Sequence, residues 1–524
     1  MIFRTRGFIG LILLIIPNLL VSQCAMVPVN LDDRVEHSDI IVEAVVTDQN
    51  CFIDQSDNHI YTANHLEVLK LFKGSLQSDE VILITQGGTV GSQGETVFPS
   101  LSMQLRNKGI FFLYSNSKME DNTYKAYSGP QGAIFYDRYS SGANDVFNTY
   151  ASVRQDVYPA IEKASGISYS VIKELPQTLV QSKAAAPNID SLSPLSVSAG
   201  TKDVLSIYGS GFGATRGTGE VVFRNASTGP GNVSPVDDEY ILWSDNLIKV
   251  EVPYSAGTGG VRVDKNGTDI SALNIRFAQL ALTTLPYPIP TVHLDNNGSG
   301  GFTWRMAMDF YSNSGAKASY ERALATWSDK TCINWSNGPS TTVDADVQDG
   351  INNVRFADTG ELEAGVLAHT RNYWTNCDAS NAFTVEIDLT YDPDKSWYYG
   401  SGNPPVHQYD IESISVHELG HAHQLGHVID LDDFMHATIG PGQTKRDLIQ
   451  NNIEAGLYVM KQSVVKKKCG PTEMKAKAGC VVPVSADQFD RDEPSMGLYP
   501  NPFNETLNIE VGRMENGIVQ IFNM

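Results

Sequence analysis

The chain has 524 residues, of which 41% are hydrophobic and 19% are charged. The hydrophobic share is ample for packed cores, so the composition excludes a wholly disordered chain, and the length predicts about three or four domains. Sixty Asp and Glu residues against 38 Lys and Arg give a formal net charge of −22. Because this charge repels phosphate backbones, we expect no nucleic-acid partner.

The first two dozen residues are typical of a targeting signal. Two arginines precede an apolar run from Phe8 to Val21, which has the length of a signal-peptide core and is short for a membrane span. We therefore predict a signal peptide over residues 1–24 and a secreted protein, extracellular or on the outer cell surface. Cys24 leaves lipid attachment open as an alternative. No later segment is apolar enough to span a bilayer, so we expect no transmembrane segment.

Export permits disulfides, and the six cysteines fall into three pairs of sequence neighbours. The expected pairs are Cys24–Cys51, Cys332–Cys377 and Cys469–Cys480. Cleavage of the signal peptide would leave Cys51 without its partner. Nearness in sequence does not fix connectivity, so buried free thiols remain the alternative.

Residues 25–170 are predicted to form an N-terminal β domain. Strand-like runs at 39–46, 65–71 and 81–84 are separated by Gly, Asn, Asp and Ser turns, which favours a β-sandwich or barrel. Nothing in this region has the spacing of metal ligands or of a nucleophile. We therefore interpret it as a structural or adhesive module, followed by a polar linker over 177–186.

A second β module is predicted over residues 187–278, where short strand-like runs recur. A Gly-Ser-Gly-Phe-Gly turn at 209–213 and Trp243-Ser244-Asp245 before a strand ending in Val252-Pro253 resemble the IPT/TIG family of immunoglobulin-like domains. The resemblance implies a β-sandwich that serves as a spacer or binding module, and it names no ligand.

The pattern changes from about residue 286 to 463, where we predict an α+β domain. Apolar residues at helical spacing indicate a helix from Gly315 to Asp329. Strands are expected at 353–356, 365–370 and 383–389, and further helices over the motif described next and over 445–460. The fold class is thus multidomain, with two all-β sandwich-like modules followed by an α+β domain.

Residues 417–427, HELGHAHQLGH, carry the chemistry. On a helix, His417 and His421 stand on one face, close enough to bind one ion, and Glu418 flanks that ion without filling a coordination position. Catalytic zinc takes three protein ligands and leaves one position open for water. His427 can supply the third ligand if the chain turns after His421. His423 lies on another face of the helix and is interpreted as a surface or packing residue and not as a ligand.

This motif resembles that of the metzincin zinc peptidases, and within them the matrixin-like group, which share HExxHxxGxxH followed by a turn that contains Met. The resemblance implies metal ligation by His417, His421 and His427, catalysis by Glu418, and Met435 as the turn methionine. It also implies that Val366, Leu367 and Ala368 belong to the strand along which the substrate binds.

Three features depart from the group. Gln424 stands where the family has the glycine that breaks the helix, so either Gln424 has a positive φ at a cost of about 1 kcal/mol or the turn shifts to Gly426. His369 matches a ligand of the structural zinc of animal matrixins, but Ile387 stands at another ligand position, so a second zinc is not expected. No cysteine-switch sequence precedes the domain, so the sequence does not support that form of latency.

The function expected from these residues is that of a secreted zinc-dependent endopeptidase acting on extracellular proteins or peptides. Zinc and Glu418 would activate the attacking water. The alternative is a surface adhesion protein whose peptidase-like domain binds without cutting. Two acidic or amide-rich segments, 344–346 and 295–298, are candidates for calcium, with solvated turns as the alternative.

The tail, after a linker over 464–495, resembles the C-terminal sorting domain of bacterial type IX secretion substrates. The matching segment is Leu498-Tyr499-Pro500-Asn501-Pro502-Phe503-Asn504, followed by strand-like runs at 507–511 and 518–521. Residues 496–524 are shorter than such a domain, so we expect a truncated one. The resemblance implies cell-surface attachment through the secretion machinery as one outcome and release as the other.

Overall fold

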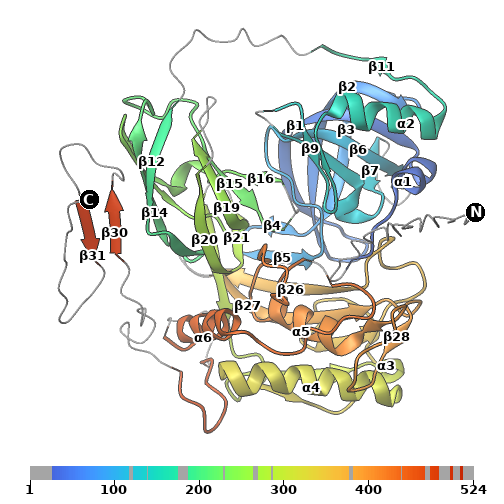
Figure 1. Ribbon diagram of the computed structural model, residues 1–524. Coiled ribbons are helices and arrows are strands. Elements are labelled where there is room, and N and C mark those ends of the chain that lie inside the picture. Colours follow the sequence, from blue (N-terminus) through green and yellow to red (C-terminus); the bar gives the residue numbers. More distant parts are fainter. Residues whose placement is uncertain are drawn as a thin grey trace, which may run out of the picture.

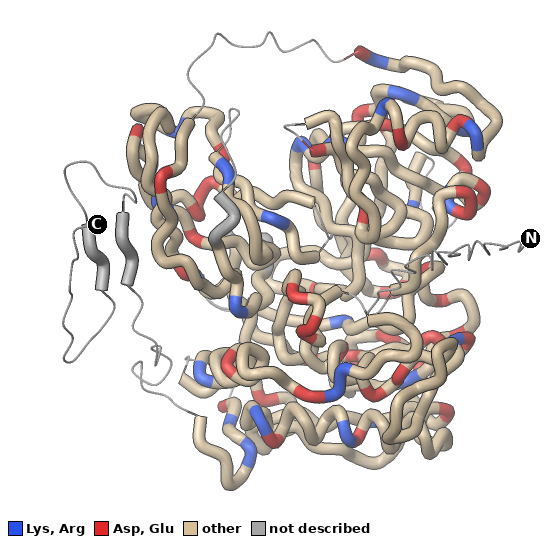
Figure 2. The backbone as a smooth tube through the Cα atoms, in the orientation of Figure 1, with Lys and Arg blue, Asp and Glu red and all other residues tan. Residues whose placement is uncertain are grey.

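The computed structural model describes most of the chain between residues 26 and 511. The described ranges are 26–116, 122–137, 140–174, 187–227, 231–263, 270–284, 287–376, 382–437, 439–465, 473–482, 496–499 and 508–511. The predicted signal peptide, Cys377, Cys469 and the run at 518–521 lie outside these residues. Acidic and basic residues are spread over every domain, so the net charge is not concentrated in one of them (Figure 2).

The N-terminal region is a β-barrel with two helices against it (Figure 1). Its sheet closes because β1 pairs with both β2 and β6, while β3 and β7 complete the ring. Three register irregularities in β1 allow this strand to bend around the barrel. Of the sandwich and the barrel that the sequence left open for this region, the structure has the barrel, so the summary of two sandwich-like modules does not hold here. Alternation of apolar residues does not distinguish a closed sheet from two packed ones.

The elements of the barrel region are α1 (Leu31–His37), β1 (Ile40–Ile53), β2 (Ile60–Lys73), β3 (Glu80–Gln86), β6 (Lys108–Ser115), β7 (Thr123–Ala126), β8 (Ala133–Tyr136), β9 (Ala143–Asn144), β10 (Thr149–Tyr150), α2 (Tyr158–Ser165) and β11 (Ser170–Val171). Apolar side chains such as Val42, Leu66 and Phe111 fill the barrel. Neighbours that alternate with them, such as Ile41 and Phe112, pack under α1 and α2. Because successive side chains of a strand point to opposite faces of the sheet, the same strands contribute to both cores.

One hairpin of this region lies outside the barrel. It consists of β4 (Gly88–Val90) and β5 (Gln93–Phe98), and β5 pairs with a strand of the C-terminal domain (Figure 1). The predicted domain over residues 25–170 is thus not one structural unit, because residues 88–98 extend a sheet formed from residues beyond 280.

Residues 187–278 form two sheets packed face to face, as predicted. One sheet contains β12 (Asn188–Ser193), β14 (Val204–Ser210), β18 (Leu247–Glu251) and β17 (Tyr240–Trp243). The other contains β13 (Ser196–Ala199), β20 (Ile270–Ala278), β19 (Ala256–Val263), β15 (Val221–Asn225) and β16 (Asn232–Val233). Trp243, singled out in the sequence, donates its indole N–H to the carbonyl of Phe212 in the glycine-rich turn, at 3.1 Å.

The C-terminal domain is a mixed sheet with helices packed beneath it (Figure 1). The strand order along the sheet is β24-β23-β25-β27-β26-β5-β4, with β22 also beside β27. The strands are β21 (Ala281–Thr284), β22 (Tyr287–His293), β23 (Phe302–Met306), β24 (Trp335–Asn337), β25 (Asn352–Phe356), β26 (Ala368–Asn376), β27 (Ala382–Tyr391), β28 (Trp397–Tyr398) and β29 (Tyr409–Asp410). The helices are α3 (Met308–Ser312), α4 (Ser314–Thr331), α5 (Ile411–Ala422) and α6 (Gln450–Val465).

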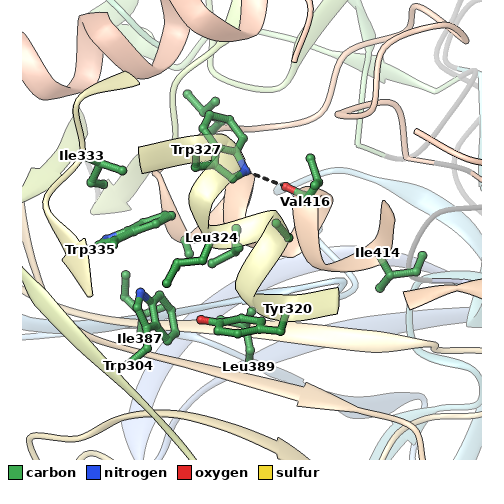
Figure 3. Packing of buried hydrophobic residues seen from close by; sticks show 14 of the residues in the cluster. Trp304, Tyr320, Leu324, Trp327, Ile333, Trp335, Ile387, Leu389, Ile414 and Val416 are labelled. Atoms are coloured by element: carbon green, nitrogen blue, oxygen red, sulfur yellow. Dashed lines mark hydrogen bonds between the residues drawn. The ribbon is translucent and has the colours of Figure 1, made fainter. Parts of the chain in front are cut away.

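Large aromatic side chains fill the space between these helices and the sheet (Figure 3). Trp327 of α4 donates its indole N–H to the carbonyl of Val416 in α5 at 2.9 Å, which fixes the two helices against each other. The predicted helix at 315–329 is confirmed as α4. The predicted helix at 445–460 begins later, at Gln450, because Arg446 is held in the preceding loop by the Asp410 carboxylate, with 2.8 Å between Nε and Oδ2.

The described residues contain one disulfide, Cys332–Cys480. The expected pairs Cys332–Cys377 and Cys469–Cys480 are therefore wrong. Residues 473–482 return to the end of α4, where Lys477 donates its N–H to the carbonyl of Cys332 at 2.9 Å. This return brings together two cysteines 148 residues apart, which nearness in sequence cannot reveal. Cys51 is exposed and not in a disulfide.

At the C-terminal end, β30 (Met496–Tyr499) and β31 (Asn508–Val511) pair antiparallel. These strands coincide with part of the predicted tail segment. None of the helices in the described ranges combines the length and the apolar character needed to cross a membrane.

Candidate metal centre

Helix α5 carries the histidine motif through the centre of the C-terminal domain. Asp410 caps its first turn by accepting the N–H of Ser413 at 3.0 Å. All twelve residues of α5 are buried, because the sheet lies on one side and α4 on the other. His417 and His421 are one turn apart, and their ring centroids are 4.6 Å apart. The helix thus holds the two imidazoles next to each other in the interior of the domain.

The chain turns directly after α5 to bring in His427. Gln424 has φ of +65°, its N–H donates to the carbonyl of His421 at 3.0 Å, and the next N–H donates to Gly420 at the same distance. Of the two turns considered from sequence, the structure has the one at Gln424 and not the one at Gly426. The Gln424 side chain donates to Asn372 Oδ1 of β26 at 2.9 Å, which helps to hold this left-handed residue in place.

The three histidines converge through one nitrogen each. His421 Nε2 lies 3.0 Å from His417 Nε2 and 3.1 Å from His427 Nε2. A zinc ion with Zn–N distances of about 2.1 Å in tetrahedral geometry separates its ligand nitrogens by roughly 3.4 Å. The observed spacing is close to this value, and among the described residues these three form the group of side chains placed to hold a metal ion.

The opposite ring nitrogens fix the tautomers. His417 Nδ1 lies 2.7 Å from the carbonyl of Phe434, and His421 Nδ1 lies 2.9 Å from that of Leu425. Both Nδ1 atoms must donate to these carbonyls, so each Nε2 presents its lone pair to the shared point. Burial lowers the pKa of all three histidines, that of His421 to about 4, which keeps them neutral. Three neutral, converging imidazoles fit zinc.

Glu418 lies beside this point on the side of β26. Its Oε2 accepts a hydrogen bond from the Thr370 hydroxyl at 2.6 Å, while Oε1 has no hydrogen-bond partner within the described ranges. Burial raises the pKa of Glu418 to about 8, although the bond from Thr370 lowers it. The carboxylate therefore has a high affinity for a proton. Sequence reasoning missed Thr370, which carries no motif signal.

Met435 lies under the helix, as expected for the turn methionine. A Cβ atom added to Gly420 would be 2.3 Å from Met435 Sδ, so only glycine admits the sulfur at this depth. Asp433 fixes the turn by accepting the N–H of Met435 at 2.7 Å and the side-chain amide of Asn452 at 2.9 Å. Gly420, Asp433 and Asn452 were not identified from sequence, because their roles depend on contacts across the fold.

The predicted substrate strand is not free. Leu367 and Ala368 are buried, and Val366 forms an antiparallel bridge with Met26 near the start of the described chain. Beyond Ala368, the outer edge of β26 pairs with β5. The strand expected over 365–370 begins at Ala368 and continues to Asn376.

The remaining candidates have structural partners. Of the surface and packing roles considered for His423, the structure shows packing: the residue is buried and lies 3.1 Å from His293 and 3.0 Å from the Thr331 hydroxyl. His369 pairs with Asp346 of the first calcium candidate at 2.8 Å, and Ile387 is buried in the core.

Asp295, in the second calcium candidate, accepts backbone N–H groups of its own turn, that of Gly300 at 2.9 Å and that of Gly301 at 3.0 Å. One of its carboxylate oxygens is therefore used in stabilising the turn.

Comparisons with known proteins agree with this geometry. The matrixin family model matches residues 300–458, and the IPT/TIG domain model matches residues 187–278. Metalloendoproteinase 5-MMP of Arabidopsis thaliana is 30% identical over 146 residues, which are 26% of this chain and 37% of the plant protein. Metalloendoproteinase 2-MMP of the same plant is 30% identical over 149 residues, 27% of this chain and 36% of that protein.

Metalloendoproteinase 1 of Glycine max is 38% identical over 68 residues, 12% of this chain and 22% of the relative. The chain therefore spans little more than a third of the length of the two Arabidopsis proteins and less than a quarter of the Glycine max protein. The similarity supports a metalloprotease.

Proposed function

Because this chain carries a matrixin domain behind an IPT/TIG domain, we propose that it is a zinc-dependent endopeptidase that hydrolyses extracellular proteins or peptides. The observation that carries the proposal is the convergence of three neutral imidazoles beside a buried carboxylate. His417, His421 and His427 would hold one zinc ion. The alternative, an adhesion protein that binds without cutting, does not require this carboxylate.

The residues of this chain divide the chemistry among them. Bound zinc supplies Lewis acidity and lowers the pKa of a water molecule in its open position. Glu418 is placed to take the proton through Oε1, while the bond from Thr370 to Oε2 holds the carboxylate in position. Burial raises its pKa, and the positive charge of a bound zinc ion would lower it again, so that the ionised carboxylate would be available to take the proton and pass it to the leaving amine.

The proposed location of the protein rests on sequence features near its two ends. The apolar run at 8–21 supports export, and the tail similar to a type IX sorting domain supports delivery to the outer surface. We propose a secreted or surface-attached enzyme on these grounds. Measuring where the full chain accumulates, with and without residues 496–524, tests this part: equal surface and medium fractions for both forms would contradict a role for the tail.

Metal analysis tests the proposed ligands. The purified chain should bind one zinc, and His427→Ala should reduce its zinc content strongly, because two imidazoles remain from a set of three. His407→Ala, at an exposed histidine outside the site, is the matched control and should leave the zinc content unchanged. Full retention of zinc by His427→Ala would contradict the ligand assignment.

Cleavage of a denatured protein tests the general base. Glu418→Gln should keep its zinc and lower chelator-sensitive cleavage by a factor of about 10² to 10⁴. Glu454→Gln on α6 makes the same chemical change at a partly exposed position and should have no effect on cleavage. A Glu418→Gln chain that cuts at the unmodified rate would contradict the proposed role.

A further inference from the structure

We infer that the N-terminal region inhibits the peptidase by placing its own strand β5 where an extended substrate would pair with β26. This inference rests on the proposed function, since it concerns access to the same site. The sequence had suggested only a structural or adhesive module for this region, and no cysteine-switch motif. The structure shows a contact between a strand of that module and the active-site strand.

The pairing of β5 with β26 covers the edge of the sheet. Six residues of each strand are in antiparallel register, from Thr370 opposite Phe98 to Thr375 opposite Gln93. The other edge of β26 pairs with β27, so both edges have partners within the described residues. The substrate segment expected from the sequence, 366–368, ends just before the residues that β5 pairs with. A substrate strand that continues from this segment along β26 needs the edge that β5 occupies, because backbone N–H and C=O groups accept one neighbour on each side.

The end of β5 also covers the metal-binding histidines. The Phe98 ring stacks on His421, with centroids 4.4 Å apart and planes 14° apart, and it meets His427 edge-on at 6.2 Å. Phe98 lies opposite Thr370, whose hydroxyl binds Glu418. His427 is only 5% exposed and Glu418 is fully buried, so in this form the site does not admit a peptide.

Buried side chains secure the strand. Glu95 of β5 accepts a hydrogen bond from Arg371 of β26 at 2.7 Å, and its carboxylate lies 3.2 Å from His59 of the barrel. A Cβ atom added to Gly94 would be 1.8 Å from the Trp374 ring, which is itself buried. The strand therefore fits β26 through one charged pair and through close contact between a glycine and an indole ring.

The barrel does not need β5 for its own closure. The ring of β1, β2, β3, β7 and β6 is complete without the β4–β5 hairpin, which extends from the barrel to the C-terminal sheet (Figure 1). Withdrawal of the hairpin therefore leaves each domain with its own core. This arrangement allows covered and open forms of the same folded chain.

Substitutions in β5 test the inference in the full chain. Gly94→Val forces β5 away from Trp374, and Glu95→Gln removes the charge that pairs with Arg371. Because the rate follows the fraction of chains with an open site, either change should raise the initial rate of cleavage of a quenched peptide by about tenfold or more. Glu80→Gln, which removes an exposed pair with His65 in the same domain, should leave the rate unchanged.

Amide hydrogen exchange supplies a readout that does not depend on activity. In the unmodified chain, residues 93–98 and 370–375 should exchange slowly, and both segments should exchange faster in Gly94→Val and Glu95→Gln. The barrel strands β1 and β2 should keep their protection, which shows that the variants have folded. Unchanged protection of residues 370–375 together with an unchanged cleavage rate would overturn the inference.

A reversible cross-link separates inhibition from the proposed function. Gln93 and Thr375 are opposite each other in the register, so Gln93→Cys with Thr375→Cys can form a disulfide across the two strands. The oxidised pair should suppress cleavage and reductant should restore it, while reductant alone should not raise the rate of the chain without the pair. If the locked chain cleaves at the unlocked rate, β5 does not inhibit. If the amides of β26 exchange faster in the β5 variants but neither the variants nor the reduced chain cleaves, the proposed function is wrong, while the covering of the β26 edge by β5 is still supported.

Discussion

The barrel and the sandwich both reach the active-site region with a short stretch of backbone, and the two contacts have opposite consequences. On the barrel side, β5 pairs with the edge of β26, and Phe98 stacks on His421. The sandwich sends the end of β20 to the turn before His427, where the N–H of Leu280 donates to Gln424 and the N–H of Gly426 donates to Ala278, both at 2.9 Å. The first contact blocks the site and the second supports one of its ligands.

This difference follows from how each module is joined to the catalytic domain. The sandwich ends at Ala278, and the chain enters the catalytic sheet through β21 and β22 directly afterwards, so its contact is part of one continuous backbone path. The hairpin contact joins residues more than 270 positions apart in the chain. The hairpin contact can therefore open without disturbing the ligands, whereas loss of the sandwich contact would displace His427.

The largest expected effect comes from breaking the charged cluster beneath β5. Arg371 binds both Glu95 and Asp346, at 2.7 Å and 2.8 Å, and all three side chains are buried. Burial alone would raise the pKa of Asp346, but Arg371 and His369 hold it well below its usual range. Arg371→Ala leaves two buried carboxylates without this cation and should lower the free energy of unfolding by about 3–5 kcal/mol.

Denaturant titration of the C-terminal domain measures this change. Glu95→Gln serves as the comparison. It removes the charge that the N-terminal region contributes to the cluster and leaves Arg371 paired with Asp346. It should cost clearly less stability than Arg371→Ala. Equal losses for the two variants would show that the cluster stabilises the interface alone and not the catalytic domain.

A smaller effect is expected inside the sandwich, where it depends on pH. Burial raises the pKa of Glu239 to about 7, from an ordinary value of 4.5. The folded domain therefore holds a proton that the unfolded chain releases, so stability is full below about pH 4.5 and falls as the pH rises towards 7. Glu239→Gln should be more stable than the unmodified chain by about 3 kcal/mol at pH 8.

Hydrogen exchange of β14 and β18 at several pH values reports this difference for the sandwich alone. The advantage of Glu239→Gln should shrink as the pH falls and disappear well below pH 4.5, where the carboxyl group is protonated in both states. An advantage that is the same at pH 4.5 and pH 8 would show that ionisation of Glu239 is not its cause.

The sequence identified the features that depend on local spacing. The histidine motif, the helix α4 and the strands of the sandwich all follow from periodicity or fixed offsets, so they could be predicted. The Cys332–Cys480 disulfide and the pairing of β5 with β26 could not, because each joins segments more than a hundred residues apart. Residues 93–98, QGETVF, do not alternate between apolar and polar side chains, so neither this strand nor its partner could be predicted from the pattern.

The smallest expected effect concerns Gln424, which the sandwich contacts through Leu280. A non-glycine residue at φ of +65° costs about 1 kcal/mol, and the bond from its side chain to Asn372 offsets that cost. Gln424→Ala loses the bond and keeps the strain, while Gln424→Gly loses the bond and relieves the strain. At a fixed zinc concentration, denaturant titration should therefore find the Gly variant more stable than the Ala variant by about 1 kcal/mol. An Ala variant as stable as the Gly variant would show that the support from the sandwich, and not glycine's freedom, determines the turn to His427.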